Sequence, residues 1–140
     1  MVAHYQFTAW LDYGVPESTL SMLEFLAKAR YTQASLLADL GDTWAGHPRG
    51  PPIIVHCSAG IGRTGTLCTL DICISRLEDS GTVDVRGTVK RIRSQRAHSI
   101  QMRDQYIFCH LALIEYALSR GLISAKPDLS GFQTSDSDTE

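Results

Sequence analysis

One segment of this 140-residue chain carries residue types able to do nucleophilic chemistry on an anion. It runs His56-Cys57-Ser58-Ala59-Gly60-Ile61-Gly62-Arg63-Thr64-Gly65, after a short β-branched run and before a helical repeat of apolar residues. Small residues allow successive backbone N–H groups to point into one hollow at a helix N-terminus, whose partial positive charge favours anions. The segment therefore predicts an oxyanion-binding loop between a strand and a helix.

Cys57 and Arg63 make this loop a candidate reactive site. If the loop curls around an oxyanion, the Cys57 sulfur lies beneath the central atom, and Arg63 closes the rim with two parallel hydrogen bonds. The positive surroundings favour a thiolate, since helix N-termini and neighbouring cations lower a cysteine pKa from about 8.5 to roughly 3.5–7.5. A thiolate nucleophile inside a phosphate cradle indicates covalent phosphoryl transfer.

Other patterns carry alternative interpretations. Gly60-x-Gly62-x-x-Gly65 also fits a dinucleotide-binding fingerprint, although Arg63 occupies its tight turn and no second clear βα unit follows. The remaining cysteines fall on predicted helix faces and form no Cys-x-x-Cys pair, so structural thiols are expected and no metal site is implied. The basic run Arg86–Arg96 predicts a solvated helix face, with a modest role in steering anionic phosphopeptides.

Apolar spacing predicts the elements that position the loop. Strands are expected at His4–Trp10, which alternates, and at Ile53–Val55, which is short and β-branched. Helices are expected at Glu17–Arg30, about Thr64–Glu78, around Val85–Ile92 and across Ile107–Leu118 with Gly121 as its C-cap. The segment Leu40–Pro52 is expected to be a surface loop because glycine and proline are frequent in it. The expected fold is α/β (α+β): a partial twisted sheet flanked by about four helices, with a strand–phosphate loop–helix unit at its centre.

Composition bounds the class of protein. Hydrophobic residues make up 44% of the chain and charged residues 20%, which is typical of one globular domain. The net charge of −2 gives no overall field that would draw nucleic acid or an anionic membrane. Four cysteines are too few for a disulfide scaffold, and no signal peptide or membrane-length apolar stretch is found, so a cytoplasmic location is expected. Residues 124–140 are polar and acidic and are expected to form a disordered tail.

Three motifs in order resemble those of the protein tyrosine phosphatases. The segment HCSAGIGRTG resembles the family's Cys-x5-Arg signature loop. Trp10-Leu11-Asp12 followed by Gly14-Val15-Pro16 resembles its mobile Trp-Pro-Asp loop. Arg93–Arg96, Ser99-Ile100-Gln101 and Gln105-Tyr106 resemble its glutamine loop. The likeness extends from about His4 to about Leu118, is to non-receptor members, and corresponds to about the C-terminal half of a catalytic domain.

The resemblance implies a role for each matching residue. Cys57 would attack phosphorus and become phosphocysteine, while Asp12 would act first as general acid and then as base. Gln101, helped by Gln105, would place the attacking water. Thr64 would hydrogen-bond the sulfur, and His56 would orient the loop and tune the thiol. The implied substrate-binding residues are Ser58, Ala59, Gly60, Ile61, Gly62, Arg63, Asp12, Gln101 and Gln105. No metal or organic cofactor is implied, and the expected partners are phosphotyrosine-containing proteins and not nucleic acid.

Two departures from the family pattern leave two functions open. Leu11 stands where the family has proline, which fixes φ near −65° and narrows the unfolded ensemble of a loop. Residues 1–123 are expected to form only part of a phosphatase domain, with unpaired strand edges that favour association. The predicted function is a protein tyrosine phosphatase acting through phosphocysteine. The alternative is a phosphotyrosine-binding module, or an incomplete relic, that binds phosphate without turnover.

Overall fold

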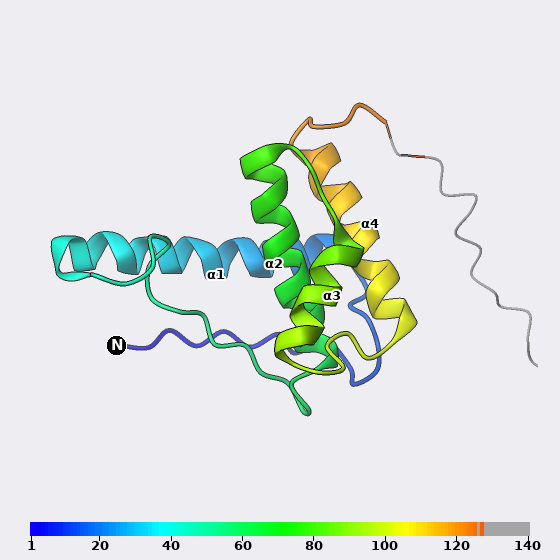
Figure 1. Cartoon of the computed structure of the whole chain (residues 1–140), viewed down its shortest axis with the longest axis horizontal. Helices are drawn as coiled ribbons and strands as arrows, with labels where there is room; N and C mark the ends of the chain where they lie inside the picture. The colour runs from blue at the N-terminus through cyan, green and yellow to red at the C-terminus, as the bar shows by residue number, and fades with distance from the viewer. Residues whose placement is uncertain (126, 128–140) are drawn as a thin grey trace, which may run out of the picture.

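The computed structural model describes residues 1–125 and 127, and its regular elements within them are helices. In chain order they are α1 (Thr19–Leu40), the 3-10 helix η1 (Gly41–Thr43), α2 (Gly62–Ser80), α3 (Val85–Gln95) and α4 (Arg103–Ser119). α2 packs against both α3 and α4, and α1 crosses this group and packs against α4. The C-terminal part of α1 extends away from the other helices (Figure 1).

The predicted α/β fold with a partial twisted sheet is wrong, because no strand occurs in the described residues. The alternating segment His4–Trp10 lies in extended form beside α1 instead. The rings of Tyr5 and Phe7 meet the ring of Phe25 edge-on, with centroids 6.5 and 5.3 Å apart. The alternating aromatic residues thus pack onto a helix, where the sequence pattern had indicated a sheet.

The second predicted strand, Ile53–Val55, is irregular backbone leading into His56. Ile53 is 43% exposed and Ile54 is 86% exposed, so this β-branched run does not enter the core. A strand is stable only when a neighbouring strand satisfies its backbone groups, and an isolated pair is marginal even then. With His4–Trp10 packed on α1, no extended neighbour pairs with Ile53–Val55 in the described part of the chain.

The four predicted helices are confirmed, although their bounds differ. α1 continues ten residues beyond the predicted end at Arg30, as far as Leu40, where Gly41 adopts a φ of +51°. Its N-terminus is capped by the Ser18 hydroxyl, which accepts from the Ser21 N–H at 3.3 Å. Gly121 follows α4 with a φ of +68°, as expected for a C-terminal glycine. Of the predicted loop Leu40–Pro52, Leu40 is the last residue of α1 and Gly41–Thr43 form the short η1, while the rest is a loop.

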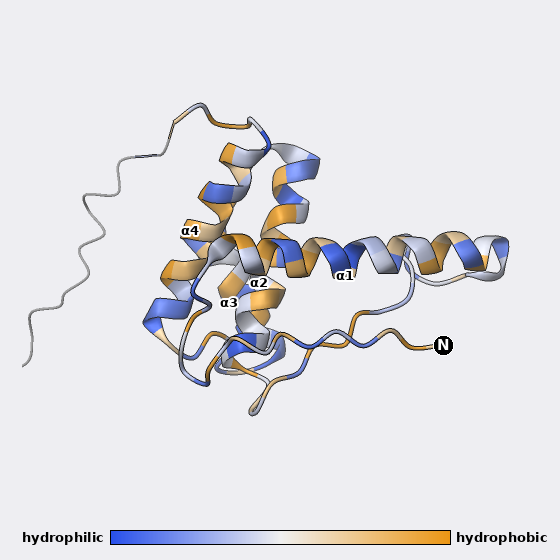
Figure 2. Ribbon diagram, turned by 180° about the vertical axis from the view of Figure 1, so that it is seen from behind, coloured by the Kyte–Doolittle hydropathy of each residue, from blue (hydrophilic) through white to orange (hydrophobic). Residues whose placement is uncertain are grey.

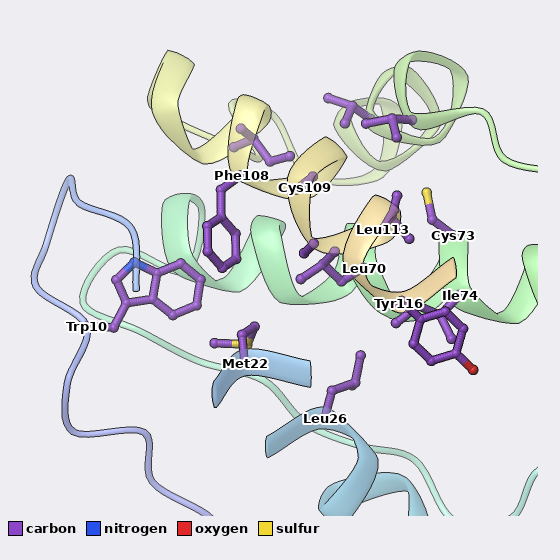
Figure 3. Packing of buried hydrophobic residues seen from close by; sticks show 14 residues of the cluster. Trp10, Met22, Leu26, Leu70, Cys73, Ile74, Phe108, Cys109, Leu113 and Tyr116 are labelled. Atoms are coloured by element: carbon purple, nitrogen blue, oxygen red, sulfur yellow. The ribbon is translucent and has the colours of Figure 1, made fainter. Parts of the chain in front are cut away.

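The core lies where α1, α2 and α4 meet, and α3 adds Val85 and Val89 to it. Figure 3 shows Trp10 beside Phe108 of α4 and close to Met22 of α1. The ring centroids of Trp10 and Phe108 are 6.4 Å apart. Leu70 of α2 is fully buried nearby. Hydrophobic and hydrophilic residues alternate along α1 where it projects beyond this core (Figure 2). The burial of Trp10 anchors the segment that carries Asp12 to the helical core.

Candidate active site

Cys57 lies in a tight loop that leads directly into α2, and we call Cys57–Arg63 the Cys57 loop. The Gly60 N–H donates to Cys57 Sγ at 3.2 Å, and the Thr64 hydroxyl donates to it at 3.1 Å. Gly60 adopts a φ of +70°, which glycine tolerates at little cost, and this turns its N–H toward the sulfur. The half-buried thiol is thus held at the N-terminus of a 19-residue helix.

The pKa of the Cys57 thiol is lowered to about 7. Partial burial by itself raises this pKa, but hydrogen bonds to the sulfur outweigh it. They come from the Thr64 hydroxyl and from the backbone N–H groups of Thr64, Gly60 and Ile61. By contrast, burial raises the pKa of Cys68, of Cys73 and, to about 12, of Cys109. Cys57 is therefore the cysteine best suited to react as a thiolate.

Asp12 and Arg63 meet at the mouth of the Cys57 loop. Arg63 Nη2 forms an ion pair with Asp12 Oδ1, and Arg63 Nη1 donates to the Trp10 carbonyl at 2.8 Å. The Ser58 hydroxyl donates to Asp12 Oδ1 at 2.6 Å. The structure thus brings together the predicted nucleophile, the predicted phosphate-binding cation and the predicted acid, from segments about fifty residues apart.

The first turn of α2 packs closely against the segment before α4. The Ile100 N–H donates to the Ile61 carbonyl at 2.9 Å, and a Cβ on Gly65 would lie 2.5 Å from Ile100 N. Ile100 holds a φ of +62°, a strained conformation for a β-branched residue, and its side chain is buried. Arg93 holds this turn, since it donates to the Ser99 and Ile100 carbonyls at 2.8 and 2.7 Å.

Gln101 and Gln105 both lie close to Gly62 at the start of α2, where a Cβ on Gly62 would be 3.1 Å from Gln105 Oε1 and 3.2 Å from Gln101 Oε1. The fully buried Gln105 accepts at Oε1 from the N–H groups of Gln101 and Met102, both at 3.1 Å. Its Nε2 donates to the Gly14 carbonyl at 3.2 Å, which also accepts from the Trp10 indole at 2.8 Å. Gln101 is exposed, so its side chain is open to solvent beside the start of α2. Gln105 therefore ties the Asp12 segment to α4, whereas Gln101 is the more accessible of the two.

Arg96 is a site residue whose role sequence reasoning missed. Its Nε donates to the Gly60 carbonyl at 2.8 Å and its Nη2 donates to the Ala59 carbonyl at 3.1 Å. A loop whose N–H groups face inward must turn its carbonyls outward, and those carbonyls need donors. This requirement is the signal that could have pointed to a nearby arginine. Arg96 braces the Cys57 loop from outside.

The remaining predicted features have fewer contacts. His56 is exposed, and its side chain has no hydrogen bond or ion pair within the described residues, so its orienting role stays a prediction. The Gly60–Gly65 pattern follows no strand in this part of the chain, so the context of a dinucleotide fingerprint is lacking there. Residues 1–125 and 127 contain no cluster of three or more potential metal ligands. Residues 126 and 128–140 of the predicted tail lie outside the described residues.

Comparison with known proteins gives relatives for most of the chain. The family model for protein-tyrosine phosphatase matches residues 1–115. Tyrosine-protein phosphatase non-receptor type 9 of Homo sapiens is 49% identical over 128 residues, which is 91% of this chain and 22% of that protein. Receptor-type tyrosine-protein phosphatase zeta of Homo sapiens is 42% identical over 120 residues, 86% of this chain and 5% of that protein. Tyrosine phosphatase H2 of Microplitis demolitor bracovirus is 38% identical over 116 residues, 82% of this chain and 36% of that protein.

The chain thus spans about a fifth of the length of the non-receptor relative. Both non-receptor and receptor-type phosphatases are among the relatives, so a cytoplasmic location stays a prediction. No helix within the described residues is long and apolar enough to cross a membrane.

Proposed function

Because this chain belongs to the protein-tyrosine phosphatase family, we propose that it hydrolyses phosphotyrosine in proteins through a phosphocysteine intermediate. One observation carries the proposal. A thiol whose pKa is lowered to about 7 lies at a helix N-terminus, within a loop whose mouth holds both an arginine and a carboxylate. These are the groups that cysteine-based phosphoryl transfer needs: a nucleophile, an oxyanion binder and a proton donor.

The first step forms the intermediate. The Cys57 thiolate attacks phosphorus, an S–P bond forms, and the bond from phosphorus to the tyrosine oxygen breaks. Protonated Asp12 gives its proton to that oxygen, so tyrosine leaves as a neutral phenol. Arg63 and the backbone N–H groups of residues 58–63 hold the non-bridging oxygens, whose charge the positive end of α2 also favours.

The second step regenerates the thiolate. Gln101 positions a water molecule, the Asp12 carboxylate takes its proton, and the oxygen attacks phosphorus as the S–P bond breaks. The Thr64 hydroxyl, 3.1 Å from Sγ, stabilises the departing thiolate. Inorganic phosphate is released, and Asp12 is again protonated. Gln105 acts as a positioning residue that ties Gly14 to the start of α4.

A second candidate function is phosphotyrosine binding without turnover. Two observations favour it: Asp12 is paired directly with Arg63, and Leu11, which replaces the family's proline, is 82% exposed. If this ion pair persists when phosphate is bound, Asp12 does not reach the leaving oxygen. General acid–base catalysis, worth about 10²–10⁴-fold, would then be lost.

Hydrolysis of para-nitrophenyl phosphate by the purified chain tests the first candidate against the second. Cys57→Ser should abolish turnover, and Asp12→Ala should lower kcat by about 10²–10⁴-fold. Binding of phosphotyrosine peptides by Cys57→Ser is measured in parallel. A folded wild-type chain that binds these peptides without turnover would establish the binding module instead.

A further inference from the structure

A groove runs between α3 and the start of α4, beside the Cys57 loop. Its volume is about 480 Å³, and its lining includes the cationic residues Arg86, Lys90, Arg93 and Arg103. Val89, Met102 and Tyr106 add apolar surface to the lining, and no carboxylate is found among the lining residues. We call it the α3 groove. Gln101, which the second catalytic step uses, also lines this groove, but the four cations take part in neither step.

Two cations of the α3 groove, Arg86 and Lys90, occupy helix positions where positive charge is unfavourable. Arg86 lies in the first turn of α3, where the helix dipole disfavours positive charge. Lys90 follows four residues later on the same face, and like charges at this spacing repel each other. Both side chains are exposed, and neither has a hydrogen bond or ion pair within the described residues. Since neither residue stabilises the helix, an anionic partner outside the chain accounts better for them.

The α3 groove is continuous with the candidate active site. An adjoining hollow of about 290 Å³ shares Arg93, Ile100 and Gln101 with it and reaches Ile61 in the Cys57 loop. A polypeptide with a phosphotyrosine over Cys57 therefore has a path along which its flanking residues reach Arg86 and Lys90. The path follows the strained turn held by Arg93, which fixes its position relative to the loop.

We propose that the α3 groove binds acidic residues flanking the phosphotyrosine of a substrate protein, through Arg86 and Lys90. The proposal rests on the proposed function and adds a preference for carboxylate-bearing substrates. A hollow lined by both cationic and apolar side chains suits a polypeptide better than the flat surface of a membrane. The net charge of −2 also makes the chain as a whole unattractive to anionic lipid.

Matched peptides test this assignment. One phosphotyrosine peptide carries Asp and Glu on its flanks, and its twin carries Asn and Gln at the same positions. Affinity is measured with Cys57→Ser and kcat/KM with the wild-type chain. Two exposed ion pairs should give the acidic peptide an advantage of roughly three- to tenfold, which 0.5 M salt should remove.

Charge reversal locates the effect. The double variant R86E/K90E should lose the advantage of the acidic peptide while its hydrolysis of para-nitrophenyl phosphate stays unchanged. Arg91→Glu is the matched control, because Arg91 lies on the same helix but does not line the groove, and it should keep most of the advantage. Circular dichroism confirms that each variant is folded.

The remaining outcomes overturn the proposal. Equal affinity for the two peptides, with phosphotyrosine still bound at Cys57, would reject the groove and leave the proposed function intact. A chain that neither hydrolyses para-nitrophenyl phosphate nor binds either peptide would reject both. Binding to phosphatidylserine vesicles that R86E/K90E abolishes, without any preference between the peptides, would assign the groove to a membrane.

Discussion

Asp12 and Arg63 form a direct ion pair across the mouth of the Cys57 loop, joining the segment before α1 to the first turn of α2. The same guanidinium also donates to the Trp10 carbonyl and to the Ser58 hydroxyl, at 2.8 and 3.2 Å. In the proposed mechanism Arg63 must bind phosphoryl oxygens, and Asp12 must face the leaving group. Bound phosphate and the Asp12 carboxylate therefore compete for one cation.

Replacing Asp12 by Asn should separate catalysis from binding. Asn keeps the shape of the side chain but supplies neither the proton nor the charge, so kcat should fall by about 10²–10⁴-fold. Arg63 is then released from its ion pair, so inorganic phosphate should inhibit the residual activity at lower concentration than it inhibits the wild type. Steady-state kinetics with phosphate as inhibitor measure both effects. Weaker inhibition by phosphate would show that the ion pair does not compete.

The reactivity of Cys57 should follow its lowered pKa. Alkylation by iodoacetamide should rise with pH to a midpoint of about 7 and level off above it, because the thiolate is the reactive form. Mass spectrometry should place the label on Cys57 before Cys109, whose pKa is raised to about 12. The stability of the fold should depend on pH in the same sense. Folding lowers the pKa of Cys57 from 9.0 to about 7, so the thiolate's contribution to the free energy of unfolding is complete above pH 9 and is lost as the pH falls through 7.

Thr64→Val provides the control for this titration. Removing the hydroxyl deletes the side-chain hydrogen bond that lowers the pKa of Cys57, so the midpoint of alkylation should move upward. The isosteric change leaves the backbone N–H in place, so the shift should be partial. An unchanged midpoint would mean that the backbone donors alone set the pKa.

Arg96→Ala should loosen the Cys57 loop without touching its reacting atoms. The Ala59 and Gly60 carbonyls would lose their charged donor, and the inward orientation of the backbone N–H groups would become less fixed. We expect kcat/KM to fall at least tenfold and the alkylation midpoint of Cys57 to rise. The exposed Arg91 provides the matched variant Arg91→Ala, which should change neither quantity. A fall in kcat/KM with no change in the midpoint would contradict a positioning role.

The helices of this fold could be predicted, because their signals are local. The left-handed glycine after α4, Gly121, acts within one turn of the helix end, and the apolar spacing acts within a few residues along each helix. The sheet could not be predicted reliably, because a strand exists only if another segment pairs with it. The alternation of His4–Trp10 is compatible with packing on a sheet or on a helix, and the partner, α1, is chosen by tertiary contacts such as that between Phe7 and Phe25.

The residues of the candidate site that share one loop could be predicted from the sequence, whereas its long-range contacts could not. Cys57 and Arg63 could be proposed from residue types and spacing within one loop. The hydrogen bonds that hold the loop could not be proposed in this way. They come from Arg96, about forty residues away, and depend on where the loop carbonyls point. The direct pairing of Asp12 with Arg63 likewise depends on how Trp10 is buried, which no local pattern encodes.

Arg30 should be important for the stability of the helical core. It donates to Asp71 Oδ1 at 2.6 Å and pairs with Glu78 at 3.7 Å, and Glu78 accepts in turn from the Tyr116 hydroxyl. This network joins α1, α2 and α4. Arg30→Met should lower the free energy of unfolding by about 1–2 kcal/mol, since the carboxylates lose a half-buried partner. Urea denaturation measures the change, and Arg91→Met, at an exposed position, should cost much less.

The exposed segment Ile53–Val55 should promote association of the chain. Ile54 is 86% exposed in irregular backbone and pairs with no strand in the described part of the chain. Exposed β-branched segments with free backbone groups pair readily between molecules. Ile54→Ser should lower the average mass measured by light scattering at high protein concentration, with little change in Tm. Ile72→Ser is the matched control: Ile72 is 45% exposed, but its backbone is satisfied within α2, so association should persist. A wild-type chain that stays monomeric at every concentration would show that Ile53–Val55 is protected in solution.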